Sequence, residues 1–157
     1  MDIELVDLFG KKAVLMLQSN PAYSSAKCVG LYQPINKEVD VSSIRDAEKV
    51  FVYPKVINND ICFYNGLLGF ERGAFGIQEP ITDHKSLPIV PDLVIVPCLA
   101  VDNSLYRVGY GKGYYDRYLR EKNIYKIGII YDFQLVAKIT DISEFDVKLD
   151  EVIIIKL

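Results

Sequence analysis

The sequence predicts a three-layer α/β/α fold with a mostly parallel central sheet, formed by a single domain over residues 1–157. Short β-branched runs alternate with helical patterns along the chain, which is typical of this class. One of these runs, residues 93–97, is apolar throughout, as expected for a central strand covered on both faces. No repeat, low-complexity tract or linker divides the chain, and half of its residues are hydrophobic, which is enough for one core.

The N-terminal part predicts a helix followed by a parallel strand pair. Apolar residues recur at helical spacing from Asp2 onward, and Asn20-Pro21 ends the pattern. Residues 28–32 and 50–53 are short apolar runs that predict buried strands. Residues 41–48, between them, predict a short crossover helix, which would make the two strands parallel.

The remaining elements complete the alternation. Residues 65–91 are rich in Gly and Pro and have little periodicity, which predicts mostly loop. A glycine-bearing loop then leads to a helix with Tyr115 and Tyr118 on one face. Four further apolar runs predict strands: residues 61–64, 93–97, 126–130 and 151–155.

Composition excludes several classes of function. The net charge is −3 and both signs are mixed along the chain, so there is no basic field for nucleic acid or for an anionic membrane. No apolar run approaches the roughly 20 residues of a membrane span. Three scattered cysteines and a single histidine, His84, disfavour structural zinc and Ser-His or Cys-His catalysis. Sparse cysteine is typical of the reducing cytoplasm, the expected location.

The most informative segment is the glycine loop, residues 109–113, which precedes the helix with Tyr115 and Tyr118. Gly109, Gly111 and Gly113 lack the Cβ that would keep a ligand from the backbone, so their N–H groups and the helix N-terminus could face phosphate oxygens. Arg107 and Lys112 add positive charge. The segment fits neither a Walker loop nor a dinucleotide fingerprint. Its spacing alone leaves both a plain connection and a phosphate site open.

The identities of the residues in and around this loop are more informative about function than their spacing. Val94-Ile95-Val96-Pro97, Asp102 and residues 107–119 closely resemble the signature of the 5-formyltetrahydrofolate cyclo-ligase family, also called methenyltetrahydrofolate synthetase. The resemblance extends over nearly the whole chain. Further segments in family order are Tyr32-Gln33-Pro34, Glu38-Val39-Asp40, Tyr53-Pro54-Lys55-Val56, residues 73–80, Gln134 and residues 146–152.

The resemblance implies an enzyme that uses ATP and Mg²⁺ to convert 5-formyltetrahydrofolate into 5,10-methenyltetrahydrofolate, ADP and phosphate. In this chemistry the γ-phosphoryl group moves to the formyl oxygen, and N10 then attacks the same carbon and phosphate departs. No enzyme nucleophile is needed, because phosphoryl transfer depends on positioning and charge neutralisation. The expected partners are therefore ATP and a reduced folate, bound by a monomer or weak homo-oligomer.

The resemblance also assigns site residues. Those expected at the ATP phosphates are Arg107, Val108, Gly109, Tyr110, Gly111, Lys112, Gly113, Tyr114 and Tyr115, with Arg107 and Lys112 as catalytic cations. Those expected at the folate are Gln33, Glu38, Tyr110, Gly111, Lys112, Gly113 and Tyr114. Asp116 and Asp146 match the family's magnesium-linked carboxylates, and Lys55 and Gln134 are weaker candidates for shaping the pocket.

Without the resemblance, the same residues would be assigned ordinary structural roles and not roles in ligand binding. Tyr115 and Tyr118 would pack in the core, Asp116 would complement the helix dipole, and Asp146 would belong to a solvated acidic face. Glu38 would lie in a surface loop.

One departure from the family pattern leaves alternatives open. Family members usually begin with a longer helix carrying a Lys-x-x-Leu-Arg motif, whereas this sequence opens near the family's second helix and Lys11-Lys12 lies in another context. We therefore keep as an alternative a homologue that binds nucleotide and folate without turnover. A third possibility is a protein-interaction domain that retains only the fold, against which the charge at the loop argues.

Overall fold

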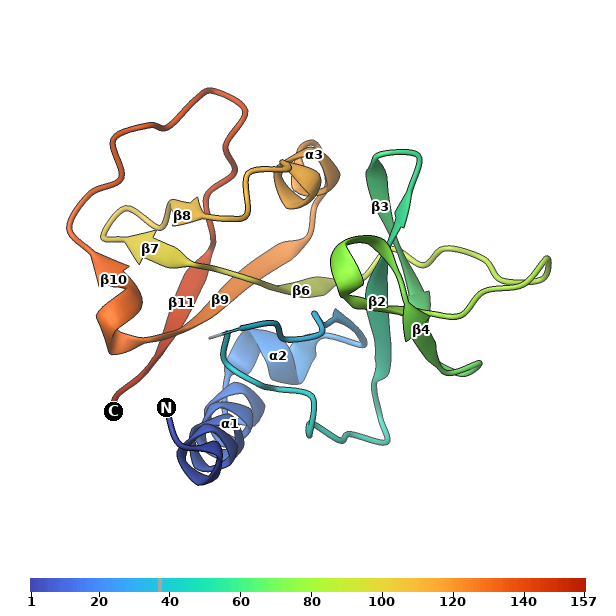
Figure 1. The fold of residues 1–157 in the computed structure, drawn as a ribbon, viewed down its shortest axis with the longest axis horizontal. Coiled ribbons are helices and arrows are strands. Elements are labelled where there is room, and N and C mark those ends of the chain that lie inside the picture. The colour runs from blue at the N-terminus through green and yellow to red at the C-terminus, as the bar shows by residue number, and fades with distance from the viewer. Residues whose placement is uncertain (37) are drawn as a thin grey trace.

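A computed structural model describes residues 1–36 and 38–157. A central sheet lies between α1 and α2 on one side and α3 on the other (Figure 1). The elements in chain order are α1 (Ile3–Gln18), α2 (Pro21–Ser25), β1 (Cys28–Gly30), β2 (Val50–Ile57), β3 (Asp60–Asn65), β4 (Phe70–Arg72), the 3₁₀ turn η1 (Ala74–Gly76), β5 (Gln78–Pro80), β6 (Leu93–Val96), β7 (Ala100–Asp102), β8 (Arg107–Val108), α3 (Tyr114–Leu119), β9 (Tyr125–Tyr131), η2 (Asp132–Gln134), β10 (Leu135–Val136) and β11 (Glu151–Ile155).

The main sheet has six strands in the order β11-β9-β6-β1-β2-β3. Every neighbouring pair is parallel except β2 and β3, which form an antiparallel hairpin at one edge. The predicted class, an α/β fold with a mostly parallel sheet, is therefore confirmed.

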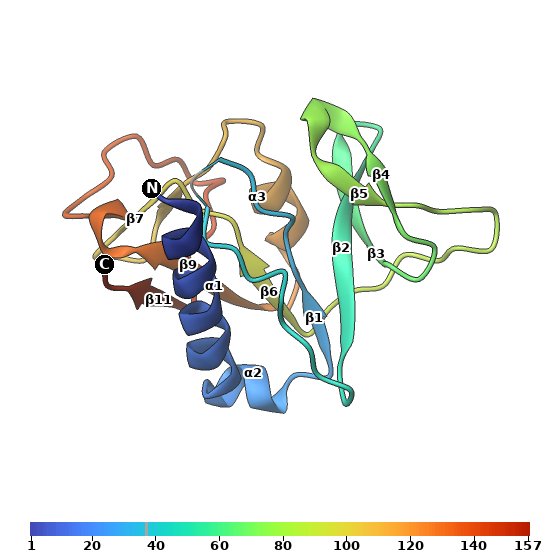
Figure 2. The same cartoon turned by 60° about the horizontal axis from the view of Figure 1, so that its bottom comes forward.

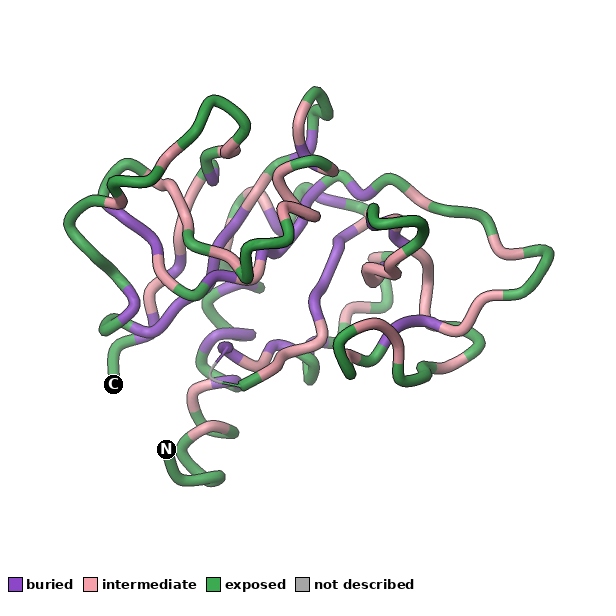
Figure 3. Tube along the Cα trace, turned by 45° about the horizontal axis from the view of Figure 1, so that its top comes forward, coloured by how far each residue is buried: buried purple, intermediate pink, exposed green. Residues whose placement is uncertain are grey.

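The apolar runs explain the three layers. In β6, Leu93 and Ile95 join the cluster that includes Leu17 of α1, whereas Val94 and Val96 join the cluster that includes Leu119 of α3. Successive strand residues point to opposite faces, so a strand buried on both faces must be apolar at every position. Figure 3 shows these buried strands running through the middle of the molecule.

The expected helix over residues 41–48 is wrong, although the parallel pairing of β1 and β2 is right. This connection consists of turns and irregular backbone. Asp40 Oδ1 accepts a hydrogen bond from the Ser42 N–H at 2.8 Å, and Asp46 Oδ1 accepts one from the Glu48 N–H at 3.1 Å. Aspartate side chains that bind nearby backbone N–H groups compete with helix formation, and the buried Ile44 anchors the turns to the core.

Residues 65–91 are mostly loop, as expected, but the first half of the segment contains a hairpin that the sequence does not predict. Strands β4 and β5 pair as an antiparallel hairpin, joined by η1, and Figure 2 shows this hairpin beside β2. Each strand has only three residues, too few for an alternating pattern. The side chain of Lys55 in β2 fixes the hairpin from outside, since its Nζ donates to Pro80 O at 3.2 Å and to Thr82 Oγ1 at 3.0 Å.

Several segments meet beyond the carboxyl ends of the parallel strands, where ligands bind in open α/β sheets. The segment after β1 carries Gln33 and Glu38, and the chain after β6 passes through β7 and β8 into the glycine loop. Strands β7, β8 and β10 form a small sheet that the sequence does not predict. No helix in the described part of the chain is both long enough and apolar enough to cross a membrane.

Candidate active site

The glycine loop connects β8 directly to α3 and has the conformation that its glycines permit. Gly111 has φ +84° and Gly113 has φ +69°, both in the left-handed region that side chains with a Cβ disfavour. A Cβ built on Gly111 would meet no heavy atom within 4 Å. The backbone at Gly111 is therefore open to a ligand.

The N–H groups of this loop are also free. None of the backbone N–H groups of residues 109–116 donates a hydrogen bond to another residue that the structure describes. Unpaired backbone donors must be satisfied by water or by a ligand. Consecutive free N–H groups around glycines form the kind of concavity that binds phosphate oxygens.

The two predicted cations differ in their placement. The Arg107 side chain is only 8% exposed, and its guanidinium lies beneath the loop: Nη1 donates to Pro97 O at 3.2 Å, and Nη2 lies 3.7 Å from Asp116 Oδ1. Lys112 is exposed and forms no ion pair with any described residue. Arg107 is thus held by contacts within the protein, whereas Lys112 is accessible to a ligand.

Asp116 and Asp146 come together although they are far apart in the sequence. Both line a cavity of about 300 Å³, together with Gly113, Arg117, Arg120 and Phe145. The Asp116 carboxylate accepts a hydrogen bond from the Val147 N–H at 3.2 Å, which joins α3 to the segment that carries Asp146.

Asp116 and Asp146 offer oxygen ligands of the kind that Mg²⁺ takes, and the side chains of Arg117 and Arg120 line the same cavity. Two carboxylates are a typical protein contribution, since Mg²⁺ keeps several waters and takes phosphate oxygens as its other ligands. The described residues contain no group of three or more His, Cys, Asp or Glu side chains that could enclose a metal alone. A cation held here would therefore need oxygens from a bound nucleotide.

Glu38 is buried, contrary to its ordinary assignment to a surface loop. Its Oε2 accepts a hydrogen bond from the Ile35 N–H at 2.9 Å. Burial raises the pKa of Glu38, and interactions with the Ile35 N–H and the Tyr110 side chain partly oppose this effect. Tyr110 is 45% exposed, so the loop tyrosine and the buried acid meet at an open edge of the site. Gln33, earlier in the same segment, is half-buried.

Phe75 also lies beside the glycine loop; it belongs to the family-like segment over residues 73–80, but the sequence assigns it no role in the site. Its ring centroid lies 6.4 Å from that of Tyr114 and 5.2 Å from the Nζ of Lys112. It belongs to η1 and has φ +57°, a conformation that is unusual for a bulky residue. Its position depends on how the β4–β5 hairpin folds back onto the glycine loop, and no local pattern encodes that.

Tyr115, Tyr118 and Gln134 make structural contacts within the protein. Tyr115 and Tyr118 pack against Phe63, with ring centroids 6.4 and 5.0 Å apart, as the sequence predicts for that helix face. Gln134 is buried, and its Nε2 donates to Cys98 O and to Leu99 O at 3.1 Å. Gln134 therefore supports the loops from below.

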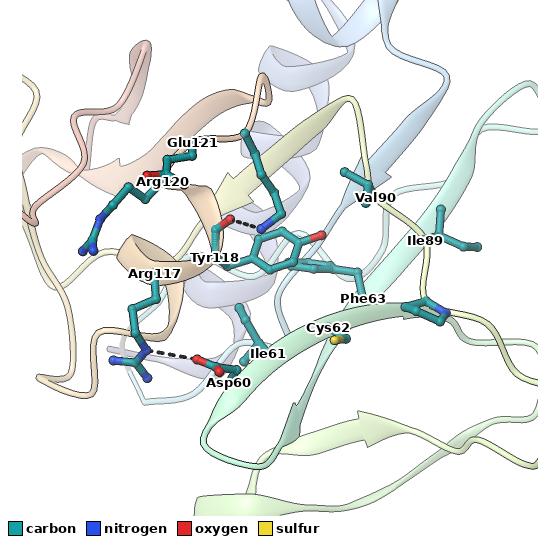
Figure 4. A pocket seen from close by; sticks show the side chains of 12 residues that line it. Asp60, Ile61, Cys62, Phe63, Ile89, Val90, Arg117, Tyr118, Arg120 and Glu121 are labelled. Carbon is teal, nitrogen blue, oxygen red and sulfur yellow. Dashed lines mark hydrogen bonds and ion pairs between the residues drawn. The ribbon is translucent and has the colours of Figure 1, made fainter.

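A larger cavity, about 630 Å³, lies between α3 and β3 (Figure 4). Arg117 Nε pairs with Asp60 Oδ1 at 3.1 Å on one side of it, and Cys62, Phe63 and Tyr118 contribute further lining. None of the residues that the sequence assigns to the site lines this cavity. Glu38, Asp116 and Asp146 instead lie beside residues of the glycine loop.

Comparisons with known proteins test the family resemblance. The model of the 5-formyltetrahydrofolate cyclo-ligase family matches residues 10–155. The chain is 34% identical over 151 residues to the 5-formyltetrahydrofolate cyclo-ligase of Mycoplasma pneumoniae, covering 91% of this chain and 80% of that protein. It is 27% identical to the protein of the same name in Escherichia coli K12, covering 92% of this chain and 86% of that protein.

A solved structure extends the likeness to three dimensions. The 5,10-methenyltetrahydrofolate synthetase of Aquifex aeolicus superposes with a TM-score of 0.84 at 32% identity, and the match covers 98% of this chain and 81% of that one. Because the family match spans nearly the whole chain and its fold is shared, the chain belongs to the 5-formyltetrahydrofolate cyclo-ligase family.

Proposed function

We propose that this chain catalyses the ATP- and Mg²⁺-dependent conversion of 5-formyltetrahydrofolate to 5,10-methenyltetrahydrofolate, with release of ADP and phosphate. The reaction is that of its family. The observation that carries the site assignment is the convergence of free loop N–H groups, two carboxylates and the Glu38–Tyr110 pair at one edge of the sheet.

The glycine loop is the proposed phosphate site. The N–H groups from Gly109 to Gly113 would donate to the triphosphate oxygens, with Val108, Tyr114 and Tyr115 flanking them. Lys112 would reach the moving phosphoryl group, because its ammonium is exposed and its side chain is flexible. Arg107 would add positive potential from beneath and hold the loop in place.

Asp116 and Asp146 would hold Mg²⁺ against the phosphates. When bound there, the ion would neutralise phosphate charge. The 3.7 Å approach of Arg107 to Asp116 keeps that carboxylate oriented within the cavity.

The folate would lie between the loop and the segment after β1. Glu38 is a buried acceptor suited to pterin N–H groups, and its desolvation would make each such hydrogen bond selective. Gln33 and Tyr110 would border the same ligand, and Tyr114 and Phe75 offer aromatic surface beside it.

The chemistry then follows from positioning. The formyl oxygen attacks the γ-phosphorus and ADP leaves; N10 next attacks the activated formyl carbon and loses its proton, and phosphate departs with the former formyl oxygen. The residues of this chain act by aligning these atoms and by stabilising the charge that develops on the phosphoryl oxygens. Such a site requires no covalent enzyme intermediate.

The test is a turnover assay with purified protein, ATP, Mg²⁺ and 5-formyltetrahydrofolate. We expect the near-ultraviolet absorbance of the methenyl product together with stoichiometric ADP, and we expect Lys112→Ala to suppress both. Lys85→Ala is the matched control, because Lys85 is another exposed lysine in a turn outside the site. Absence of product at high enzyme concentration would refute the proposal.

Calorimetry separates the outcomes of a negative assay. Binding of ATP or folate without product would favour the non-catalytic homologue, and no binding would favour an interaction domain.

We further propose that the protein acts in the cytoplasm as a monomer or weak homo-oligomer. Fractionation of cells would test the location, and light scattering on the purified protein would test the oligomeric state.

A further inference from the structure

Glu79 in β5 is a buried carboxylate whose two oxygens both accept hydrogen bonds from backbone N–H groups. Oε1 accepts from Ala74 at 3.0 Å, and Oε2 accepts from Val56 of β2 at 3.2 Å. Within the described residues, no cationic group lies within ion-pair distance of Glu79. A buried charge held only by backbone donors is costly to desolvate, so its hydrogen bonds are expected to hold specific segments in place.

The segment that Glu79 holds is the turn over residues 73–76. Within it, Phe75 has φ +57°, a conformation that persists only where surrounding contacts fix it. Gly73 lies directly against the carboxylate, since a Cβ at this position would come within 2.2 Å of Glu79. The carboxylate therefore packs beneath the turn and ties it to β2.

This turn carries the Phe75 ring to the glycine loop. The ring is 65% exposed, so burial in the core does not account for its position. Its neighbours are Tyr114 and Lys112, at 6.4 and 5.2 Å. An exposed aromatic face offers a stacking surface for a flat ring, such as the pterin of the proposed substrate.

We propose that Glu79 is a positioning residue, which fixes the turn over residues 73–76 so that Phe75 closes one wall of the folate site. The inference rests on the proposed function, since it names what determines affinity at that site. Glu79 would act through Phe75 and would not touch ATP. Its loss should therefore weaken folate binding selectively.

The first test is steady-state kinetics of Glu79→Gln. The amide keeps the shape of the side chain, but its NH₂ group cannot accept a hydrogen bond, so one of the two links is lost. We expect the KM for 5-formyltetrahydrofolate to rise about tenfold, with the KM for ATP changing less than about twofold. Glu71→Gln is the matched control: Glu71 lies in the same hairpin, its side chain is 56% exposed, and its one ion pair among the described residues, with Lys55, is 3.5 Å long.

The second test needs no turnover. The chain contains no tryptophan, so Phe75→Trp introduces a single tryptophan on the turn, whose emission can be excited selectively. We expect Glu79→Gln in this background to lower the anisotropy of Trp emission and to increase its quenching by acrylamide. Glu71→Gln in the same background should change neither.

Ala74→Pro provides a second route if Glu79→Gln does not fold. Proline removes the N–H that donates to Glu79 Oε1 and is tolerated at the first position of a helical turn. It should reproduce the rise in KM for folate.

The outcomes are distinguishable. An active wild type with unchanged folate KM and unchanged Trp anisotropy in Glu79→Gln would overturn the inference. An inactive wild type would instead refute the proposed function, while the anisotropy would still report whether Glu79 fixes the turn.

Discussion

Gly111→Ala tests whether a ligand approaches the backbone of the glycine loop. Gly111 has φ +84°, and a Cβ there would meet nothing within 4 Å in the free protein. The substitution therefore introduces backbone strain without a steric clash. In the nucleotide complex the same methyl group would occupy the space where we place phosphate oxygens.

The two effects have different magnitudes. A left-handed conformation costs an L-residue about 1–2 kcal/mol, which for a chain of this length lowers the melting temperature by about 2–8 °C. Displacing a phosphate from even one charge-assisted hydrogen bond costs a further 1.5–3 kcal/mol, about tenfold or more in affinity. The KM for ATP should therefore rise at least tenfold, an effect that the strain alone cannot produce.

Gly69→Ala is the matched control. Gly69 has φ +89°, and a Cβ there would lie 3.8 Å from Ile81 Cδ1, an ordinary contact outside the glycine loop. Both variants should lose similar thermal stability by calorimetry, but only Gly111→Ala should raise the KM for ATP. If the two variants share the same kinetics, the backbone at Gly111 does not contact the nucleotide.

Three further predictions follow from the site. Lys112→Ala should leave the free energy of unfolding within about 0.5 kcal/mol of wild type, because the Lys112 side chain is exposed. The same substitution should lower kcat/KM for ATP at least about tenfold. Urea unfolding checks the first result, and stopped-assay kinetics checks the second. Burial raises the pKa of Glu38, so ionisation of this carboxyl destabilises the folded wild type as the pH rises, whereas Glu38→Gln has no such group. The melting temperature of Glu38→Gln minus that of wild type should therefore increase between about pH 4 and pH 8. A difference that does not change with pH would contradict this. Asp102→Ala should cost about 2–4 kcal/mol in urea unfolding, because this buried carboxylate accepts three backbone hydrogen bonds. Burial raises the pKa of Asp102 but those hydrogen bonds outweigh it, so the pKa is lowered and the contribution should be lost as pH falls through that value.

The sequence predicted the sheet better than its connections. Apolar runs located β1, β2, β3, β6, β9 and β11, and the run is most complete in β6, because a strand buried on both faces has to be apolar along its length. It failed where side chains override local pattern. Asp40 and Asp46 replace a helix with turns in the crossover, and Lys55 and Glu79 stabilise a hairpin whose strands are too short to be recognised.

The sequence alone predicted the fold class, the glycine loop and the resemblance to one enzyme family. These features depend on residue types that lie close together along the chain. Tertiary structure alone brought Asp146 beside Asp116, buried Glu38 beneath Tyr110, fixed Arg107 under the loop and carried Phe75 across to Lys112. These neighbours come from segments far apart in the chain. Their proximity depends on how the hairpin and the loops pack on the sheet, and no short stretch of sequence records that packing.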